Sequence, residues 1–122
     1  MPLTILHVED HTVVADAVRD TLEAEGWRVV TCADGAAALN RLAGDEAFDL
    51  LITDNHLPYV NGLEVVRYAR QLPHRAAMPV VMFTSVDCPA EARRAGADAF
   101  LRKPEDVNEL VPTVARLLRR GA

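Results

Sequence analysis

The sequence predicts an α/β domain in which helices cover both faces of a doubly wound, five-stranded parallel sheet, a (βα)5 arrangement. The first observation is a strict alternation of five β-type and five helical segments along the 122 residues, which is typical of parallel sheets. The second is that two β-type segments contain unbroken apolar runs, "LLI" at 50–52 and "VVMF" at 80–83, as strands buried on both faces do. The length predicts a single domain over residues 1–122.

The first four elements establish the alternation. The run "LTILHV" at 3–8 is β-rich, and residues 11–26 follow with apolar side chains at helical spacing and a glycine stop. The second strand is predicted at 27–32, "WRVVTC". The alanine-rich segment 34–44 is predicted to be a helix that begins with Asp34 as its cap and ends at a glycine.

The central elements have the strongest patterns. The third strand is predicted at 48–53, "FDLLIT", where apolar residues dominate. A helix follows at 61–72, with Asn61 as its expected cap. The fourth strand, at 78–84, is almost continuously apolar, which predicts a position inside the sheet.

The last three elements include a short helix. Residues 88–96 are predicted to form it, and Pro89 is tolerated in its first turn. The fifth strand is expected at 97–103 and the final helix at 106–120. Because a proline cannot donate a helical hydrogen bond, Pro112 predicts a late start or a mild kink in that helix.

Composition restricts the classes of function. The net charge of −5 disfavours direct binding to nucleic acid or to an anionic membrane. Cys32 and Cys88 have no zinc-type spacing and are expected to be reduced thiols. No basic leader and no apolar run of about 20 residues is present in the sequence, so a cytoplasmic location is expected.

Polar residues gather where the predicted strands end. Glu9 and Asp10 follow the first strand, Asp54 the third, Thr84 ends the fourth and Lys103 ends the fifth. Ligands of open α/β sheets bind at this edge. Each residue alone has an ordinary explanation as a cap, turn or loop residue, but their joint placement favours a site.

The residue types at that edge indicate the chemistry. Clustered carboxylates repel one another unless a cation or proton intervenes, and oxygen ligands without histidine or cysteine suit Mg²⁺. An ammonium and a hydroxyl beside them complete a predicted phosphoryl-transfer site. A carboxylate can itself be the nucleophile, and we expect Asp54 to have this role because a rigid strand delivers it to the site.

Four motifs, "VEDH", "LLITDNHLPYVNGLE", "VVMFTS" and "GADAFLRKP", together resemble the receiver domain of bacterial two-component response regulators. The resemblance covers essentially the whole chain and implies a flavodoxin-like strand order, 2-1-3-4-5. It implies that Asp54 accepts a phosphoryl group from the phosphohistidine of a sensor histidine kinase or a phosphotransfer protein. It also implies a Mg²⁺ site made by Asp10, Asp54 and the backbone carbonyl of His56, with Glu9 acting through a water.

The resemblance also implies a switch. Lys103 would pair with the phosphoryl oxygens, Thr84 would move toward them, and Phe100 would turn inward as Thr84 moves. A Lys103–Pro104 cis bond is implied as well. Such a protein would catalyse its own phosphorylation and dephosphorylation and would not be an enzyme acting on outside substrates. The loop after the acceptor matches the family at Pro58 and Gly62.

Two departures from the family pattern stand out. The segment between Thr84 and Lys103 is about one helical turn short, so a short fourth helix or a reshaped loop is expected at the usual output surface. His56 and Val86 occupy variable positions near the acceptor, and we hypothesise that they tune the lifetime of the phosphorylated state.

Other histidines and other functions are weaker candidates. His7 and His11 flank a strand end and are not expected to bind zinc, and His74 is expected to be a solvated loop residue. A Mg²⁺ phosphatase like the haloacid dehalogenases would need D-x-D where this chain has "DNH", and an FMN-binding flavodoxin would need a Ser/Thr/Gly-rich loop where it has "EDHTVV". A receiver fold that acts without phosphorylation as an interaction module is the remaining alternative.

No motif in the sequence identifies the partner downstream of the switch. The output partner or domain is unknown, and a stand-alone regulator and a part of a larger or hybrid protein both fit. The amphipathic segment "VARLLRR" could support a phosphorylation-linked homodimer.

Overall fold

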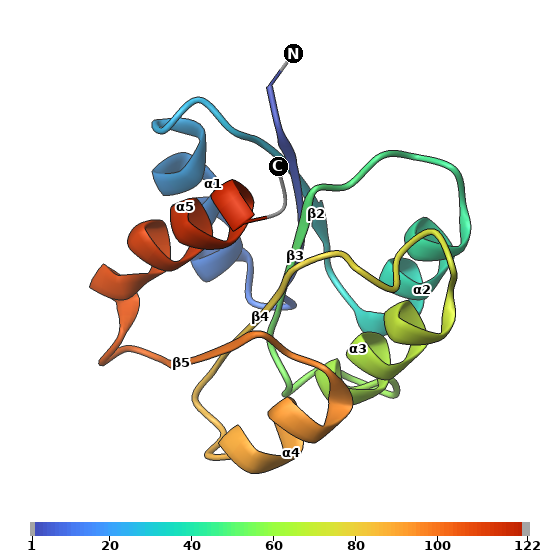
Figure 1. The fold of residues 1–122 in the computed structure, drawn as a ribbon. Coiled ribbons are helices and arrows are strands. Elements are labelled where there is room, and N and C mark those ends of the chain that lie inside the picture. The colour runs from blue at the N-terminus through green and yellow to red at the C-terminus, as the bar shows by residue number, and fades with distance from the viewer. Residues whose placement is uncertain (1, 121–122) are drawn as a thin grey trace.

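Five parallel strands form one sheet in the order β2-β1-β3-β4-β5, in a computed structural model that describes residues 2–120 (Figure 1). The strands are β1 (Thr4–Val8), β2 (Arg28–Cys32), β3 (Leu50–Thr53), β4 (Val80–Thr84) and β5 (Ala99–Arg102). The helices are α1 (Thr12–Glu23), α2 (Gly35–Ala43), α3 (Gly62–Gln71), α4 (Pro89–Ala95) and α5 (Leu110–Arg120), with a 3-10 turn, η1 (Val107–Glu109), before the last. The predicted fold class and strand order are confirmed.

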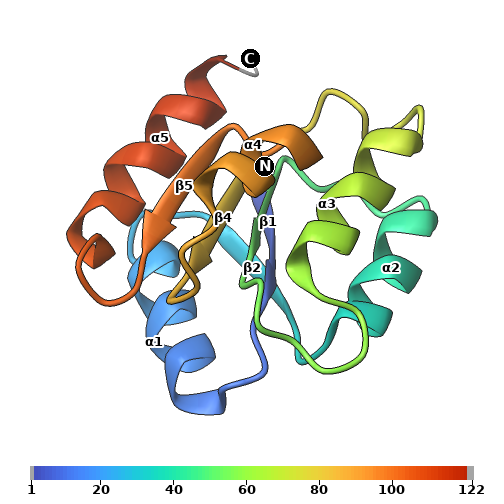
Figure 2. The same cartoon turned by 90° about the horizontal axis from the view of Figure 1, so that it is seen from below.

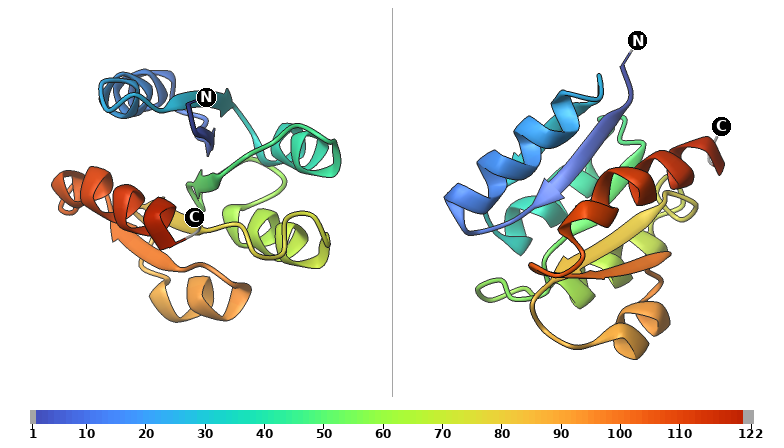
Figure 3. Two further views of the ribbon diagram at one scale, coloured as in Figure 1. Left: turned by 45° about the horizontal axis from the view of Figure 1, so that its top comes forward. Right: turned by 90° about the vertical axis from the view of Figure 1, so that its left-hand side faces the viewer.

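Helices cover both faces of the sheet. Helices α1 and α5 lie on one face and α2 and α3 on the other (Figures 2 and 3), and α4 joins the α2–α3 face beside the edge strand β5. Alternate residues of each strand therefore enter different cores: Leu51 packs on the α2–α3 side, and Leu50 and Ile52 pack on the α1–α5 side. All three are fully buried, which explains the unbroken apolar run in β3.

The element ends match the local signals. The Asp34 carboxylate accepts a hydrogen bond from Ala37 N at 2.7 Å, and Asn61 makes a capping box with Glu64. Both predicted caps are therefore confirmed. Gly96 ends α4 with a φ of +118°, a conformation that glycine adopts without a steric cost.

Some predicted bounds were too wide. The third and fourth strands begin at Leu50 and Val80, two residues later than expected, because the preceding residues bond outside the regular ladder. Phe48 is buried all the same. The last helix begins at Leu110 after a 3-10 turn, so the late start predicted from Pro112 is confirmed. Pro112 lies in the first turn, where a helix needs no amide donor.

Arg70 of α3 ties three segments together. Its Nη2 and Nε donate to the Gly96 carbonyl at 2.7 and 3.0 Å, and Nη2 pairs with Asp98 at 3.0 Å. Nη1 donates to the Met78 carbonyl at 2.6 Å. The end of α4 is thereby fixed to α3 and to the approach to β4.

The carboxyl ends and the amino ends of the strands lie on opposite sides of the sheet, and different parts of the chain lie at each. All five strands point the same way, so their carboxyl ends share one edge. Strand β1 begins at the opposite, amino edge, and α5, which returns antiparallel to the strands, ends there (Figure 1). Among residues 2–120, no helix has the length and apolar character needed to cross a bilayer.

Candidate functional site

Three carboxylates meet at the carboxyl edge. Because Val8 of β1 and Thr53 of β3 are register partners, the residues that follow them emerge together. Carboxylate oxygens of Glu9, Asp10 and Asp54 lie within 4.8 Å of one another. Glu9 and Asp54 are buried, at 3 % and 8 % exposure, whereas Asp10 is exposed. The predicted cluster is therefore formed.

Lys103 neutralises part of this negative charge. Its ammonium donates to a Glu9 carboxylate oxygen and to Asp54 Oδ2, the latter at 3.1 Å. The Lys103 side chain is only 16 % exposed, so this ion pair lies largely away from solvent. The direct Glu9–Lys103 contact was not anticipated from the sequence. The peptide bond from Lys103 to Pro104 is cis, as the resemblance implied.

The loop between β3 and α3 contacts both the side chain and the backbone of Asp54. The His56 amide donates to Asp54 Oδ1 at 3.1 Å, and the His56 side chain is exposed. Gly62 lies so close that a Cβ there would be 2.1 Å from the Asp54 carbonyl oxygen. Glycine is thus required at Gly62 by close backbone packing. Pro58 is exposed within the same loop.

The same loop contains a backbone outlier. Tyr59 has a φ of +66° and is the one residue other than glycine with a positive φ between positions 2 and 120. A positive φ costs a residue with a Cβ about 1–3 kcal/mol. Its side chain is fully exposed. Nothing in the local sequence pattern signals this conformation.

Thr84 and Phe100 lie on the neighbouring strands β4 and β5. Thr84 ends β4, is fully buried, and its Oγ1 accepts a hydrogen bond from Val86 N at 3.2 Å. Phe100 is half-buried in β5, and the Arg102 guanidinium lies 5.4 Å from its ring centre. Arg102 also pairs with Asp87 at 2.7 Å, so Phe100 and the β4–α4 loop are joined through Arg102.

Helix α4 is short, as predicted. It spans Pro89–Ala95, and Cys88 just before it is buried. Cys32 at the end of β2 is also buried, and both thiols are free. Burial raises the pKa of each thiol, so neither is a reactive thiolate near neutral pH.

The histidines do not share one environment. His7 is 1 % exposed inside β1, and its Nδ1 has no hydrogen-bond partner in the described part of the chain. Burial lowers the pKa of His7 to about 4, and the Lys103 charge adds to this effect while Asp54 opposes it. His11 is exposed at the start of α1.

The expectation for His74 was incomplete. The residue is exposed, but its Nε2 lies 2.9 Å from the Gly44 carbonyl oxygen and 3.1 Å from that of Leu42. The neighbouring Arg75 is buried and donates to the same two carbonyls. Both side chains therefore satisfy the end of α2, a long-range role that local sequence does not reveal.

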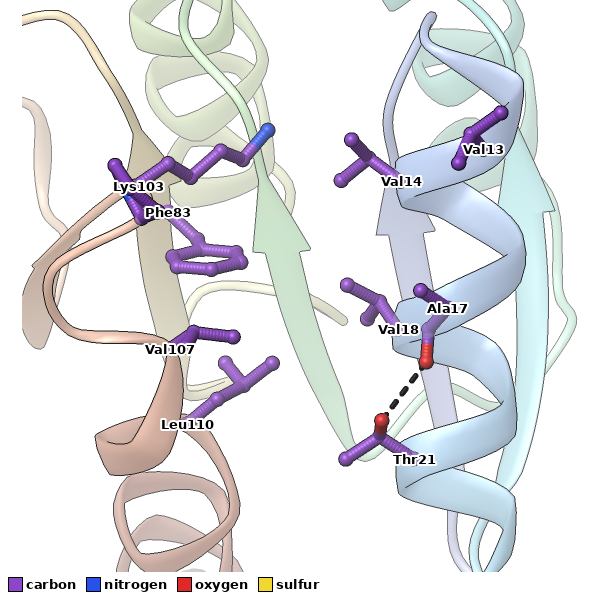
Figure 4. A pocket seen from close by; sticks show the side chains of 10 residues that line it. Val13, Val14, Ala17, Val18, Thr21, Phe83, Lys103, Val107 and Leu110 are labelled. Atoms are coloured by element: carbon purple, nitrogen blue, oxygen red, sulfur yellow. Dashed lines mark hydrogen bonds between the residues drawn. The ribbon is translucent and has the colours of Figure 1, made fainter.

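The mouth of the site opens into an apolar cleft. A cavity of about 320 Å³ is lined by the acidic residues with His56, Ser85 and Lys103. It shares Val14 and Lys103 with a cleft of about 300 Å³ between α1 and the start of α5. Figure 4 shows Val13, Val14 and Val18 on the α1 side, facing Val107 and Leu110.

The donor set suits a hard divalent cation. Glu9, Asp10 and Asp54 each offer a carboxylate oxygen to the same small volume, where a shared cation could be held. Oxygen donors with no thiolate or imidazole among them fit Mg²⁺. The chemistry of a metal, an ammonium and a hydroxyl around one carboxylate suits phosphoryl transfer to Asp54.

Comparison with known proteins gives a consistent result. The model of the response regulator receiver domain family matches residues 5–115. The response regulator PmrA of Pseudomonas aeruginosa is 39 % identical over 122 residues, covering 97 % of this chain and 53 % of that protein. PhoB of Rhizobium meliloti, a phosphate regulon transcriptional regulator, is 39 % identical over 117 residues, covering 93 % of this chain and 51 % of PhoB. The chain thus spans about half the length of these relatives.

Solved structures agree with the fold. A CheY-like response regulator receiver domain protein from Methanospirillum hungatei superposes with a TM-score of 0.90 at 29 % identity, covering 99 % of this chain and 97 % of that one. The receiver domain of the P. aeruginosa sensor histidine kinase PA1611 has a TM-score of 0.86 at 26 % identity and covers 97 % of this chain and 98 % of that one. That second structure has a magnesium ion coordinated in its active site cleft.

Proposed function

This chain belongs to the response regulator receiver domain family of two-component signalling proteins, and on that premise we propose that Asp54 is its phosphoryl acceptor. The donor is a phosphohistidine on a sensor histidine kinase or a phosphotransfer protein. The observation that carries this proposal is the buried Asp54 carboxylate, held by the His56 amide on one oxygen and by Lys103 on the other.

The transfer needs little besides positioning and charge neutralisation. An Asp54 carboxylate oxygen forms a bond to phosphorus while the bond from phosphorus to the histidine nitrogen breaks, and the electron pair returns to the imidazole. Lys103 offsets the charge that gathers on the phosphoryl oxygens. Asp10 and Asp54, with the His56 carbonyl and a water on Glu9, would hold Mg²⁺. When bound, Mg²⁺ supplies further positive charge to those oxygens.

The phosphorylated state differs from the resting state by a large local charge. A phosphoryl group adds about −1.5 to −2 charges and strong acceptors. Thr84 gives up its bond to Val86 N and donates to the new oxygens. The space it leaves lets Phe100 repack, and the surface of α4, β5 and α5 changes for an output partner.

His56 and Val86 set how long the signal lasts. Both are exposed, and His56 lines the mouth of the site, where a water must approach the phosphoryl group for hydrolysis. We expect the double variant His56→Ala, Val86→Ala to alter the first-order decay rate of the phosphorylated protein, measured by intact mass over time. An unchanged decay rate would remove this role.

The direct test is phosphorylation by a small donor. Purified wild-type protein, Asp54→Asn and the control Asp45→Asn are incubated with Mg²⁺ and acetyl phosphate, and intact masses are measured. Asp45 is exposed in the α2–β3 connection. We expect one phosphoryl adduct on the wild type and on Asp45→Asn, none on Asp54→Asn, and none on any protein when EDTA removes the metal.

Two results contradict the proposal. An equal adduct on Asp54→Asn would place the acceptor elsewhere. No adduct on the wild type, together with no binding of the phosphoryl mimic beryllofluoride, would favour an interaction module that works without phosphorylation.

A further inference from the structure

The β3–α3 loop carries an aromatic side chain, Tyr59, that does not pack against the rest of the domain. Tyr59 is 100 % exposed, and within residues 2–120 its hydroxyl has no hydrogen-bond partner. Val60 N donates to the Pro58 carbonyl at 2.7 Å, a bond that closes a γ-turn around Tyr59, and such a turn with positive φ is rare and strained. Backbone strain combined with full exposure of an aromatic ring indicates a functional role more than a structural one.

The turn that presents Tyr59 is held firmly on both sides. Leu57 before it is buried, and Val60 after it packs against the core, close to Gly35 of α2. The Asn55 side chain accepts from Leu63 N at 3.1 Å, which fixes the loop to the first turn of α3. A ring mounted on a fixed turn loses little conformational entropy when a partner covers it.

Tyr59 belongs to the loop that follows the acidic site. It follows Asp54 by five residues, and His56 of the same loop lines the mouth of the site. The loop projects past the carboxyl edge of the sheet in Figure 3 (right). A macromolecule that brings a reactive group to the 8 %-exposed Asp54 must cover this rim, and tyrosine is among the residues that dominate binding at such contacts.

We propose that Tyr59 is a docking anchor for the phosphohistidine-bearing domain of the donor protein. This inference rests on the proposed function, because it assigns a partner to the same site. A donor must reach Asp54 through the mouth that His56 of the same loop lines, whereas an output partner reads the surface of α4, β5 and α5. Small donors such as acetyl phosphate enter without contacting the ring. Comparing a protein donor with a small donor therefore separates an effect on docking from an effect on the transfer step.

The test compares a protein donor with a small one. Autophosphorylated histidine kinases of the source organism, carrying radioactive phosphate, are each mixed with the wild-type chain, and the kinase with the highest kcat/KM is used. The variants are Tyr59→Ala and Tyr59→Gly, which remove the ring with and without backbone strain, and Tyr59→Phe, which keeps it. Leu3→Ala, an exposed apolar residue at the amino edge, is the matched control.

We expect kcat/KM for transfer from the kinase to fall about tenfold in Tyr59→Ala and Tyr59→Gly, the loss typical of an interface anchor. Tyr59→Phe and Leu3→Ala should stay near the wild-type value. All four variants should label at the wild-type rate with acetyl phosphate.

Three outcomes overturn the proposal: wild-type transfer from the kinase to Tyr59→Ala, an equal loss with acetyl phosphate, or labelling of the wild type by acetyl phosphate but by no kinase. Each leaves Asp54 as the acceptor. Failure of acetyl phosphate to label the wild type counts instead against the proposed function itself.

Discussion

The buried histidine in β1 predicts a specific loss of stability in mild acid. His7 is 1 % exposed, and burial, with Lys103 as a smaller cause, lowers its pKa from 6.5 to about 4. Below pH 6.5 the unfolded chain binds a proton on His7, whereas the folded chain does not until about pH 4. The free energy of unfolding is therefore undiminished by His7 above pH 6.5. It falls as the pH drops from 6.5 toward 4, and below pH 4 His7 lowers it no further.

The size of the effect follows from the shift. A difference of 6.5 − 4 = 2.5 pKa units corresponds to about 3.5 kcal/mol, at about 1.4 kcal/mol per unit. By pH 5 about 2 kcal/mol of this should be lost. Because carboxylates also titrate near pH 4 to 5, the comparison must be made against a variant that lacks only the His7 imidazole.

The assay is urea unfolding at pH 7.5 and pH 5.0 for wild type, His7→Leu and the exposed-histidine control His11→Gln. Between the two pH values the wild type and His11→Gln should each lose about 2 kcal/mol more unfolding free energy than His7→Leu. Equal losses in wild type and His7→Leu would refute the reasoning, since His7 would then titrate alike in the folded and unfolded chains.

Three further predictions concern backbone and packing, each measured as an unfolding free energy in urea. Tyr59→Gly should be about 1 kcal/mol more stable than Tyr59→Ala, because only glycine accepts the left-handed turn without strain; equal stabilities would argue against that strain. Gly62→Ala should lose about 2–3 kcal/mol, since its Cβ meets backbone at 2.1 Å, whereas Gly44→Ala, with 3.5 Å to its nearest neighbour, should change little. Arg70→Gln should lose about 2 kcal/mol because its part-buried carbonyl partners lose their donors, and Arg67→Gln, exposed on the same helix, should lose under about 0.5 kcal/mol; similar losses in both would contradict the anchoring role of Arg70.

Local patterns were enough to predict the order of elements and the place of the acidic cluster. Period and capping signals identify where Asp34 and Asn61 begin their helices. Parallel topology then brings the residues after β1 and β3 to one edge without any knowledge of contacts. The acidic cluster of Glu9, Asp10 and Asp54 was predictable for that reason.

Contacts between residues distant in sequence were not predictable in the same way. The pairing of Lys103 with Glu9 joins residues 94 positions apart, and His74 reaches carbonyls 30 and 32 positions away. Neither leaves a periodic signal. The positive φ of Tyr59 was not predicted, because tyrosine is an unfavourable residue for that conformation. Residue type alone therefore predicts a negative φ at this position.

The two ends of the described chain lie at the amino edge of the sheet, with its full length between them and Asp54. A fluorescent protein, biotin tag or surface tether attached at either end would leave the acidic mouth and the Tyr59 rim facing solution. Sensor-chip binding measurements with kinases can therefore use either terminus for immobilisation. A reporter meant to sense the phosphoryl group by proximity should instead be attached through an engineered residue in the β4–α4 connection.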